Sequence, residues 1–376
     1  MREQSAGGLI VLAPHGSRRV AMLQAALATA GRVPAIALDY AKLLDRPGRL
    51  RDALDTRPDA WVKLESPGED AALQHALIAH GRRVLDVDDA PFEPLQHGEL
   101  AERRAWFAGF SGLLQGIEHV CVGLPLRWVN APADIVAMGD KLACRDHLQA
   151  AGVNVPALLG SGEVRDLDDL LARCRAQHQW QVFLKPRYGS SAAGVVACRL
   201  HRDGRMVIES ATRAIDQDGR LRLVNYLRPQ RLRDPAAIRL LIDAICAEGA
   251  YAERWVPKPR AGTQGHFDLR LVMLAGEPRQ RLARISHGAL TNLHLGNRRA
   301  DADQLLDTVA MDTMETIGRQ CAAAFPASHV IGLDVIVRGR SAQVLEANAF
   351  GDLLLDVRYQ GAGTHDDQAR RFGAMA

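Results

Sequence analysis

Apolar and polar residues alternate along two short stretches near the end of the chain, 331–337 and 345–349. A period of two is typical of β-strands that have one buried and one polar face. The two stretches therefore predict an antiparallel hairpin. A three-residue loop, 339–341, would set Asp334 directly across from Glu346, with Asn348 two residues further along, whereas a two-residue loop would separate them.

The polar face of this predicted hairpin carries oxygen ligands. Asp334 and Glu346 supply carboxylates and Asn348 an amide oxygen. This set suits Mg²⁺, which prefers oxygen ligands and completes its shell with water and phosphates. The alternative is a half-exposed hairpin with an acidic outer face. For these three residues in isolation that alternative is favoured, so the rest of the chain decides.

The first 130 residues alternate between apolar runs and amphipathic segments. Strands are predicted at 9–12, 33–38, 61–64 and 83–87, and helices at 19–30 and 69–80, the latter stopped by Gly81. This order predicts an open α/β layer with a parallel sheet. The loop 13–17 follows the first strand, at the edge where such sheets bind ligands, but it lacks the G-x-G-x-x-G of dinucleotide sites. His15 and Ser17 are candidates for substrate contact, with capping of the next helix as the alternative.

A second region is predicted to begin near residue 130. A helix is expected from Pro132 to about Ala151, ended by Gly152. From about residue 157 the pattern predicts β-hairpins mixed with helices, including an amphipathic helix at 303–324. The tail 361–376 is polar and glycine-bearing, and its end is expected to be loosely held.

Composition narrows the class of protein. The chain has 376 residues, 47% of them hydrophobic and 24% charged, which is ordinary for a globular protein of two or three domains. A net charge of +3 spread along the chain predicts neither a nucleic-acid partner nor a membrane surface. Six scattered cysteines without a C-x-x-C pair favour reduced thiols. Because no signal-peptide pattern or membrane span is found, a cytoplasmic location is expected.

A small-residue loop follows a predicted strand in the middle of the chain. The strand 181–186 ends at Pro186 and leads into Gly189-Ser190-Ser191-Ala192-Ala193-Gly194. Glycine, serine and alanine let backbone N–H groups approach an anion closely, and Lys185 adds a compact positive charge. This is not a P-loop, since G-x-x-x-x-G-K-[ST] is absent. Alone the motif is weak, because Gly-Ser turns occur in many hairpins.

Three further segments combine a strand pattern with polar side chains. Residues 251–257 predict a strand that presents Glu253 and Trp255 on one face, and 266–273 a strand on which Asp268 and Arg270 share a face. The passage 284–299 is unusually polar for a segment after a strand. A core strand, a surface ion pair and a solvated loop are the structural alternatives. Functionally, Arg284, His287, Arg298 and Arg299 hint at an acidic substrate.

In this order the pieces resemble an ATP-grasp enzyme, of the carboxylate-amine ligase type that includes D-alanine–D-alanine ligases. The resemblance covers about the last two-thirds of the chain and rests on 130–135, Asp140-Lys141, 152–156, 183–194, Glu253, 268–270, Asn292, 332–334 and 346–348. It implies an N-terminal pre-ATP-grasp α/β domain (1–130), a central subdomain with a phosphate-covering flap (131–256), and a C-terminal α+β subdomain with the metal and substrate site (257–376). The first 130 residues match only in general pattern.

The resemblance also assigns residues. Asp334, Glu346 and Asn348 would hold two Mg²⁺ ions, with Mn²⁺ as an alternative. Arg270, Asn292 and Arg284 would act in catalysis by stabilising the transferring phosphoryl group and the charge that develops on the attacked carbonyl. The residues assigned to ATP are Lys141, Lys185, Gly189, Ser190, Ser191, Ala192, Gly194, Glu253, Trp255, Val256 and Asp268.

The implied reaction is phosphorylation of a small-molecule or peptide carboxylate by ATP, followed by attack of an amine on the acylphosphate. Water must be kept out, because an acylphosphate hydrolyses. Three alternatives stay open: a kinase, a carboxylate-thiol ligase, and a nucleotide-binding module without turnover. The identities of the acid and the amine cannot be derived from the chain. A homodimer is the commonest assembly for such proteins, but the sequence does not decide it.

Overall fold

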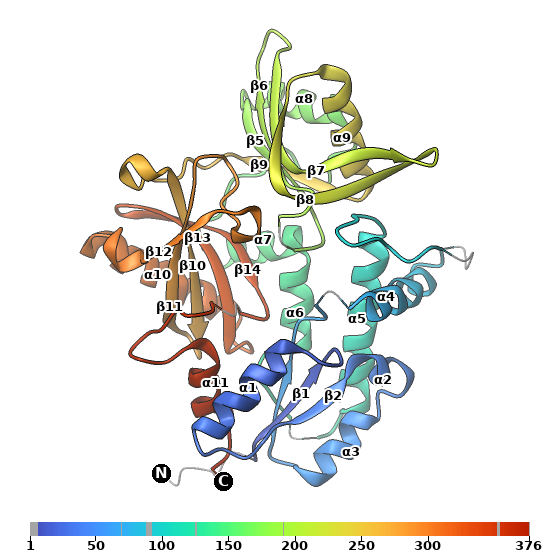
Figure 1. The fold of residues 1–376 in the computed structure, drawn as a ribbon, viewed down its shortest axis with the longest axis vertical. Coiled ribbons are helices and arrows are strands. Elements are labelled where there is room, and N and C mark those ends of the chain that lie inside the picture. Colours follow the sequence, from blue (N-terminus) through green and yellow to red (C-terminus); the bar gives the residue numbers. More distant parts are fainter. Residues whose placement is uncertain are drawn as a thin grey trace.

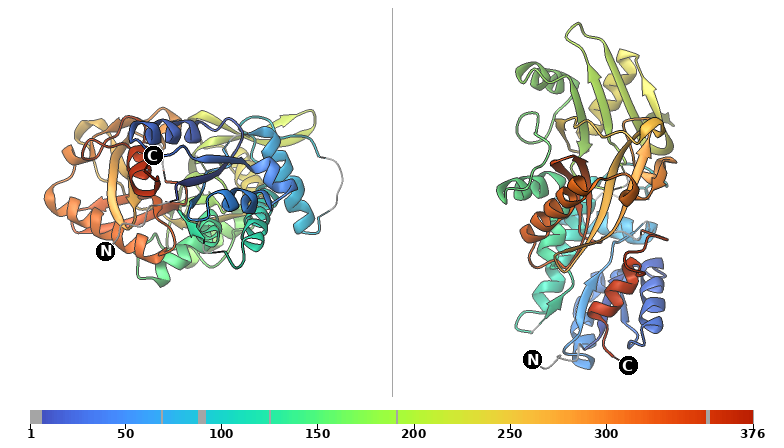
Figure 2. Two further views of the ribbon diagram at one scale, coloured as in Figure 1. Left: turned by 90° about the horizontal axis from the view of Figure 1, so that it is seen from below. Right: turned by 90° about the vertical axis from the view of Figure 1, so that its left-hand side faces the viewer.

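The computed structural model describes residues 7–68, 70–87, 92–124, 126–190, 192–351 and 354–375. Three β-sheets follow one another along this chain (Figure 1). The first sheet lies at one end of the long axis and the central sheet at the other. The C-terminal sheet lies between them, to one side (Figures 1 and 2).

The first sheet has parallel strands in the order β2-β1-β3-β4. All five residues of β1 are buried, because Ile10 and Leu12 pack into one core cluster and Leu9 and Val11 into another on the opposite face. The predicted open parallel α/β layer is therefore confirmed. Its elements are β1 (Leu9–Ala13), α1 (Arg18–Thr29), β2 (Ile36–Asp39), α2 (Tyr40–Asp45), α3 (Arg49–Thr56), β3 (Trp61–Leu64), α4 (Ala71–Val84), α5 (Arg103–Val120) and β4 (Arg127–Trp128).

One predicted strand and one predicted helix end are wrong. Residues 83–87 form the end of α4 and a turn, and α4 continues through Gly81. Gly81 lies where α4 crosses α5: a Cβ there would overlap the carbonyl oxygen of Ala105, and a Cβ on Gly109 would overlap that of Leu77. Gly81 is therefore a close-packing position of two helices and not a helix stop.

The helix predicted from Pro132 to Ala151 is two helices, α6 (Pro132–Gly139) and α7 (Lys141–Ala150). The break is Asp140, whose backbone is extended. Its carboxylate accepts the N–H of Ala143 at 3.1 Å and so caps α7. The same carboxylate pairs with Arg187 at 2.6 Å. The break therefore ties the start of α7 to the loop that follows β5 (Gln181–Pro186).

Both later sheets are antiparallel. The central sheet has the order β8-β7-β6-β5-β9 and the C-terminal sheet the order β12-β11-β10-β13-β14. The predicted helix 303–324 is found as α10 (Thr308–Ala324), which begins five residues later than predicted and packs on the C-terminal sheet. The remaining elements are α8 (Leu167–Ala176), β6 (Val196–Leu200), β7 (Met206–Gln217), β8 (Arg220–Leu232), α9 (Pro235–Ala247), β9 (Ala250–Arg254), η1 (Gly262–Gln264), β10 (His266–Leu274), β11 (Glu277–Ser286), η2 (Leu293–Leu295), β12 (Arg298–Ala300), η3 (Ala302–Gln304), α10 (Thr308–Ala324), β13 (Val330–Arg338) and β14 (Ser341–Asn348).

The hairpin of β13 and β14 pairs Asp334 with Glu346 as predicted, but by a different route. Its loop has two residues, 339–340, a length that by itself would separate the carboxylates. The register shifts between Val335 and Asp334, where Leu345 is the extra residue of a β-bulge. The bulge restores the pairing of Asp334 with Glu346.

The end of the chain returns to the first sheet, so the prediction of a loosely held end is wrong for the residues up to Met375. Helix α11 (Thr364–Phe372) lies beside α1 (Figures 1 and 2). Phe372 is fully buried and its ring centroid lies 5.1 Å from that of Trp61. Each of the three predicted domain ranges contains one sheet. Helix α11, from the last range, nevertheless packs on the first range. The domain boundaries remain a proposal.

A buried ionic group joins this tail to the first sheet. Glu65, directly after β3, lies 2.6 Å from the ammonium of Lys63 and 3.5 Å from the guanidinium of Arg19. Arg19 also donates to the carbonyl of Phe350, in the loop after β14. His365 of α11 faces the group, and burial lowers its pKa from 6.5 to about 4, against the opposing field of Glu65.

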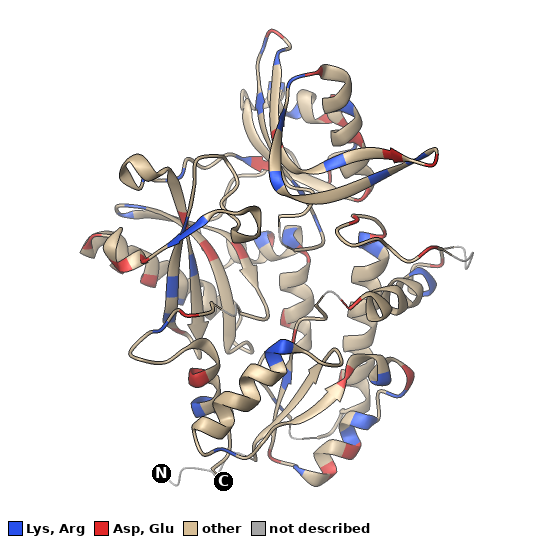
Figure 3. Cartoon of the chain, viewed as in Figure 1, with Lys and Arg blue, Asp and Glu red and all other residues tan. Residues whose placement is uncertain are grey.

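Charged residues of both signs are spread over all three sheets and their helices (Figure 3). Within the described residues, no helix is both long enough and apolar enough to cross a membrane.

We expect Gly81→Ala to destabilise the fold by at least about 2 kcal/mol, because the new methyl group forces α4 and α5 apart. Gly116→Ala is the matched control in α5, since its Cβ would lie 3.9 Å from Pro47; it should be neutral or stabilising by up to about 1 kcal/mol. Urea unfolding of both variants measures the difference. Equal free energies of unfolding would contradict the close crossing.

Acid is expected to weaken the attachment of α11. The folded protein holds His365 neutral, so between pH 6.5 and about 4 the unfolded chain binds the extra proton and stability falls as the pH falls. The contribution of this one group is at most about 3 kcal/mol. His365→Gln should reduce the loss in free energy of unfolding between pH 7 and pH 4.5, whereas His15→Gln, at an exposed position, should not. If the free energy of unfolding falls equally with pH in the unaltered protein and in His365→Gln, the loss does not come from His365.

Candidate functional site

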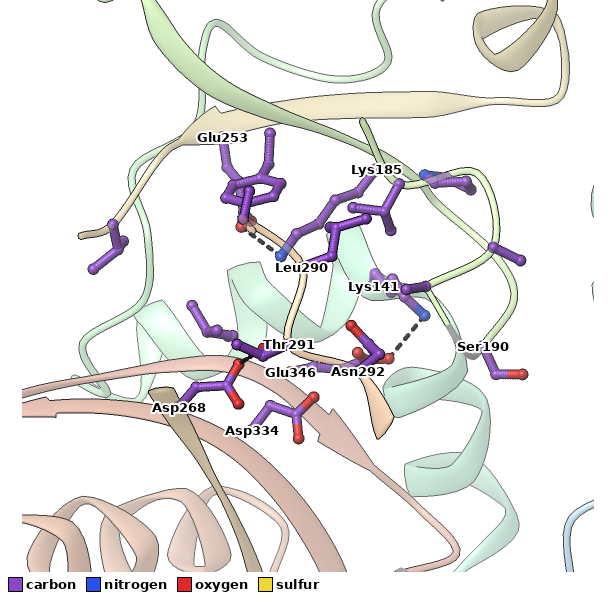
Figure 4. A pocket seen from close by; sticks show the side chains of 18 of the residues that line it. Lys141, Lys185, Ser190, Glu253, Asp268, Leu290, Thr291, Asn292, Asp334 and Glu346 are labelled. Carbon is purple, nitrogen blue, oxygen red and sulfur yellow. Dashed lines mark hydrogen bonds and ion pairs between the residues drawn. The ribbon is translucent and has the colours of Figure 1, made fainter. Parts of the chain in front are cut away.

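A pocket lies between the central and C-terminal sheets (Figure 4). Its empty volume is about 770 Å³, including space that is open to solvent. Its lining combines apolar side chains with four cations and four anions. The charged residues are Lys141, Lys185, Lys258, Arg284, Glu253, Asp268, Asp334 and Glu346. Three of the five lysines in the chain therefore meet here.

Lys185 and Glu253 form one wall. The ammonium of Lys185 lies 2.5 Å from a carboxylate oxygen of Glu253. Because β5 and β9 are antiparallel and Lys185 pairs with Tyr251, Glu253 stands two residues away on the same face. Burial raises the pKa of Glu253 and Lys185 opposes that effect. The pair is thus a buried ion pair that needs both members.

Lys141, the first residue of α7, connects three elements. Its ammonium lies 2.9 Å from Glu346 on β14 and donates to the carbonyl of Gly189 in the loop after β5. Its backbone N–H donates to the carbonyl of Arg187 at 3.1 Å. Lys141 therefore faces both the loop and the predicted metal ligands, as Figure 4 shows.

The floor of the pocket is a network of charges on neighbouring strands of the C-terminal sheet. Arg284 on β11 is 4% exposed and donates to Asp268 at 2.8 Å. It also lies 3.1 Å from Asp334. Arg270 on β10 lies 2.7 Å from the other oxygen of Asp334. Lys258 completes the network, 3.2 Å from Asp268.

In this network the pKa values of the two aspartates are shifted in opposite directions. Burial would raise the pKa of Asp268, but Arg284, Lys258 and a hydrogen bond from Thr291 together lower it below the ordinary value. At Asp334 burial prevails and the pKa is raised, although Arg270 and Arg284 oppose it. Burial also lowers the pKa of Lys258. Asp334 is therefore the carboxylate that gains most from further positive charge.

The predicted metal ligands fit Mg²⁺ by their chemistry. Among the residues that the structure describes, no three His, Cys, Asp or Glu side chains are grouped to hold a metal, so a cation here depends on two carboxylates and an amide. Asp334 and Glu346 are paired across the hairpin, and Asn348 follows on β14. A divalent cation would offset the burial of Asp334. Glu346, whose side chain is 29% exposed, is the more accessible oxygen ligand.

The pocket also has apolar lining residues. Phe183 and Val256 come from the central sheet and the strand exit after β9, and Leu290, Ile336 and Leu345 come from the C-terminal part. Leu345 reaches the pocket next to Glu346, because the bulge changes the alternation of β14 at that point. A pocket lined by apolar side chains and lysines can hold a flat base and a polyphosphate.

The structure brings most of the predicted site residues together. Those that line the pocket are Lys141, Lys185, Gly189, Ser190, Ala192, Glu253, Val256, Asp268, Arg284, Asn292, Asp334 and Glu346. Ser191 lies outside the described residues. The remaining four do not line the pocket. Arg270 pairs with Asp334, which does line it, and Trp255 packs against Phe183 with ring centroids 4.9 Å apart. Gly194 donates its N–H to Thr212, and Asn348 donates its side-chain amide to the carbonyl of Gly332.

The residues proposed to mark an acidic substrate are mostly elsewhere. Arg298 and Arg299 are exposed on β12 and donate to the carbonyls of Gln264 and Leu355. His287 is exposed as well. Only Arg284 of this set lines the pocket, and its guanidinium is engaged by two aspartates. The described residues thus provide no cluster of these four side chains.

His15 and Ser17 border a separate hollow at the carboxyl edge of the first sheet, together with Lys42 and Arg49. Ser17 precedes α1 but makes no side-chain capping hydrogen bond. Neither residue lines the pocket between the later sheets.

Several pocket residues were not assigned from the sequence. Lys258 is the most informative, because it is one of only five lysines and this rarity was a usable signal. Its ammonium donates to Thr291 at 2.7 Å. Leu290, Ile336 and Leu345 were also missed as lining residues, and no local pattern separates such side chains from ordinary core positions.

No protein-family model matches the chain, and no curated protein matches it. Solved structures match it over nearly the whole length. The D-cycloserine synthetase DcsG aligns with a TM-score of 0.54 at 16% identity, over 97% of this chain and 100% of that one. The macrocyclase MdnC bound with precursor peptide MdnA from Microcystis aeruginosa MRC gives 0.53 at 11%, over 97% and 99%. The ATP-grasp ligase PsnB complexed with minimal precursor gives 0.51 at 14%, over 97% and 98%. The chain therefore has the ATP-grasp fold, as the resemblance implied.

We expect Arg284→Met to destabilise the protein by about 3–5 kcal/mol, because it leaves Asp268 and Asp334 buried with less compensation. Arg281→Met is the matched control on the same strand. Arg281 pairs with the half-exposed Asp303 at 2.6 Å, so its loss should cost about 1 kcal/mol or less. Urea unfolding at pH 7 measures both variants. Equal losses would show that the network does not depend on Arg284.

Proposed function

We propose that this chain is an ATP- and Mg²⁺-dependent ligase that activates a substrate carboxylate as an acylphosphate and joins it to an amine. The proposal is carried by one observation. Lysines from α7, β5 and the segment after β9 converge with the carboxylate pair of β13 and β14 on one pocket that also has apolar lining residues. These residues are spread over positions 141 to 346, so the arrangement exists only in the fold.

The pocket suggests how ATP lies in it. The base fits against the apolar side chains of the lining, between Phe183 and Leu345 and near the backbone after Glu253. The triphosphate then extends toward Lys141, Lys185 and the loop after β5. In the structure both lysines are paired with carboxylates, at 2.9 and 2.5 Å. We infer that these ion pairs hold the lysines in place until phosphate oxygens share them.

Mg²⁺ would be held by Asp334, Glu346 and Asn348. When bound, it supplies positive charge that draws the triphosphate and these carboxylates together and offsets the charge of the transferring phosphoryl group. The protein's own cations do the same at fixed positions, because Arg284 and Arg270 are anchored on Asp334 at 3.1 and 2.7 Å.

The proposed reaction has two steps. A carboxylate oxygen of the substrate bonds to the γ-phosphorus as the bond to the bridging oxygen of ADP breaks. The amine nitrogen then bonds to the carbonyl carbon, the bond from that carbon to the phosphate oxygen breaks, and the nitrogen loses a proton to water. Arg270 and Asn292 are proposed to stabilise the transferring phosphoryl group and the carbonyl oxygen. Asn292 lines the pocket beside Glu346 (Figure 4).

Both peptides and small molecules are candidate substrates. Two of the similar structures, PsnB and MdnC, are described with precursor peptides, and DcsG is named a synthetase of the small molecule D-cycloserine. These names support a carboxylate substrate of either size for this chain. A homodimer stays part of the proposal without a structural observation that bears on it.

The test is an assay of ADP and product formation with ATP, Mg²⁺, a panel of amino acids and peptides as carboxylates, and hydroxylamine or amino acids as amines. We expect ADP and an amide or hydroxamate in equal amounts, read by mass spectrometry, only when all components are present. Lys185→Gln and Glu346→Gln should each lower kcat/KM for ATP at least about 100-fold, since each removes charge that positions the phosphates. Arg338→Gln, at the exposed end of β13, should stay within about twofold of the unaltered protein.

Other outcomes select the alternatives. ADP and a stable phosphorylated product without an amine would indicate a kinase, and a requirement for a thiol would indicate a carboxylate-thiol ligase. Thermal stabilisation by ATP and Mg²⁺ without any ADP, across the whole panel, would indicate a nucleotide-binding module.

A further inference from the structure

Helix α5 of the first sheet's unit contacts the wall of the pocket from outside. Phe107 stacks on Tyr188, with ring centroids 4.3 Å apart and planes inclined by 19°. Tyr188 belongs to the loop after β5 and lines the pocket beside Gly189. None of the residues of α5, all of which the structure describes, lines the pocket itself. The contact therefore acts on the loop and not on a ligand.

The ring of Phe107 also lies close to the end of α6, just before the helix that begins with Lys141. A Cβ on Gly139 would lie 3.1 Å from the ring of Phe107, so only a glycine leaves the ring its full space there. Gly139 is the last residue of α6 and stands two residues before Lys141. Phe107 thus lies between the break that starts α7 and the loop that follows β5.

Arg103, one turn before Phe107 on α5, contacts the next residue of the loop. A Cβ on Gly189 would overlap the guanidinium of Arg103, and the φ of Gly189 is 112°, a region that favours glycine. From the other side, the ammonium of Lys141 donates to the carbonyl of Gly189. Gly189 is therefore held between a cation of the first unit and a cation of the pocket.

The segment before α5 is fixed to the central sheet. The N–H of Leu100 donates to the carbonyl of Leu223 at 2.8 Å, and the N–H of Asn225 donates to the carbonyl of Gly98 at 2.8 Å. One guanidinium nitrogen of Arg222 donates to both carboxylate oxygens of Glu99, each at 3.0 Å. Strands β8 and β5 belong to the same sheet. These contacts therefore fix α5 against the sheet that carries the pocket wall of Lys185 and Glu253.

We propose that Arg103 and Phe107 form a seat that positions Lys141 and Gly189 relative to one another, and that this seat sets the geometry with which the pocket grips the phosphates of a nucleotide. They are positioning residues, since neither lines the pocket. A shift of about 1 Å in a phosphate-binding group is enough to cost a large factor in rate. The effect on turnover rests on the proposed function, whereas the seat exists without a nucleotide.

Hydrogen exchange of the nucleotide-free protein tests the seat directly. Phe107→Ala should speed exchange about tenfold at residues 139–143 and 187–190 and leave β13 unchanged, because only those two segments lose their support. Phe92→Ala is the matched control: Phe92 stacks on His75 of α4 at 4.3 Å and 26°, and it does not line the pocket. Its exchange at the two segments should equal that of the unaltered protein.

Arg103→Ala is the second variant, and it decides the matter if Phe107→Ala does not fold. In calorimetry with ATP and Mg²⁺, both seat variants should raise Kd about tenfold, and the Phe92 control should change it less than about twofold. In a ligase assay they should lower kcat while KM for the carboxylate stays constant. Unchanged exchange at both segments in the folded seat variants would overturn the inference. Absence of turnover in the unaltered protein would count against the proposed function alone.

Discussion

Matched burial of opposite charges is the constraint on which the pocket depends. Glu253, Asp268, Arg284 and Asp334 are all nearly fully buried, and each has a partner of opposite sign within 3.2 Å. Such pairs seldom add stability over apolar residues of similar size, but a lone member is strongly destabilising. The network therefore holds cations and carboxylates at fixed positions at little net gain in stability, an arrangement suited to the proposed binding of a polyanion and a divalent cation.

Backbone irregularities place these charges. The bulge at Leu345 brings Glu346 opposite Asp334 in a hairpin whose two-residue loop would otherwise separate them. The break at Asp140 starts a new helix at Lys141 and directs its ammonium to Glu346 and to the loop after β5. Regular continuation of β14, or of one helix through residue 140, would turn these side chains away from the pocket. The break at Asp140 is supported by a side chain far away in sequence, because Asp140 pairs with Arg187.

The first unit is more than an appended α/β layer. Helix α5 packs against the loop after β5, which carries Gly189, and against the end of α6, just before the break that precedes Lys141. Arg19 reaches from α1 to the carbonyl of Phe350, directly beyond the predicted metal ligands of β14. The last helix, α11, closes over the ionic group at Glu65. Elements at both ends of the chain thus support a pocket whose lining comes from residues 141 to 346.

Local pattern was sufficient to predict the parallel first sheet and the hairpin at 331–349, because period-two alternation reports burial and direction over a few residues. The resemblance to ATP-grasp enzymes assigned twelve of the residues that line the pocket. The order of short motifs indicated the ATP-grasp fold, which the similar structures share. Pattern could not separate the glycine of a helix crossing, Gly81, from a helix stop, since both need a residue without a side chain. Nor could it place Lys258 beside Asp268, the bulge at Leu345 or the seat at Phe107. Those contacts join distant segments, so only tertiary packing decided them.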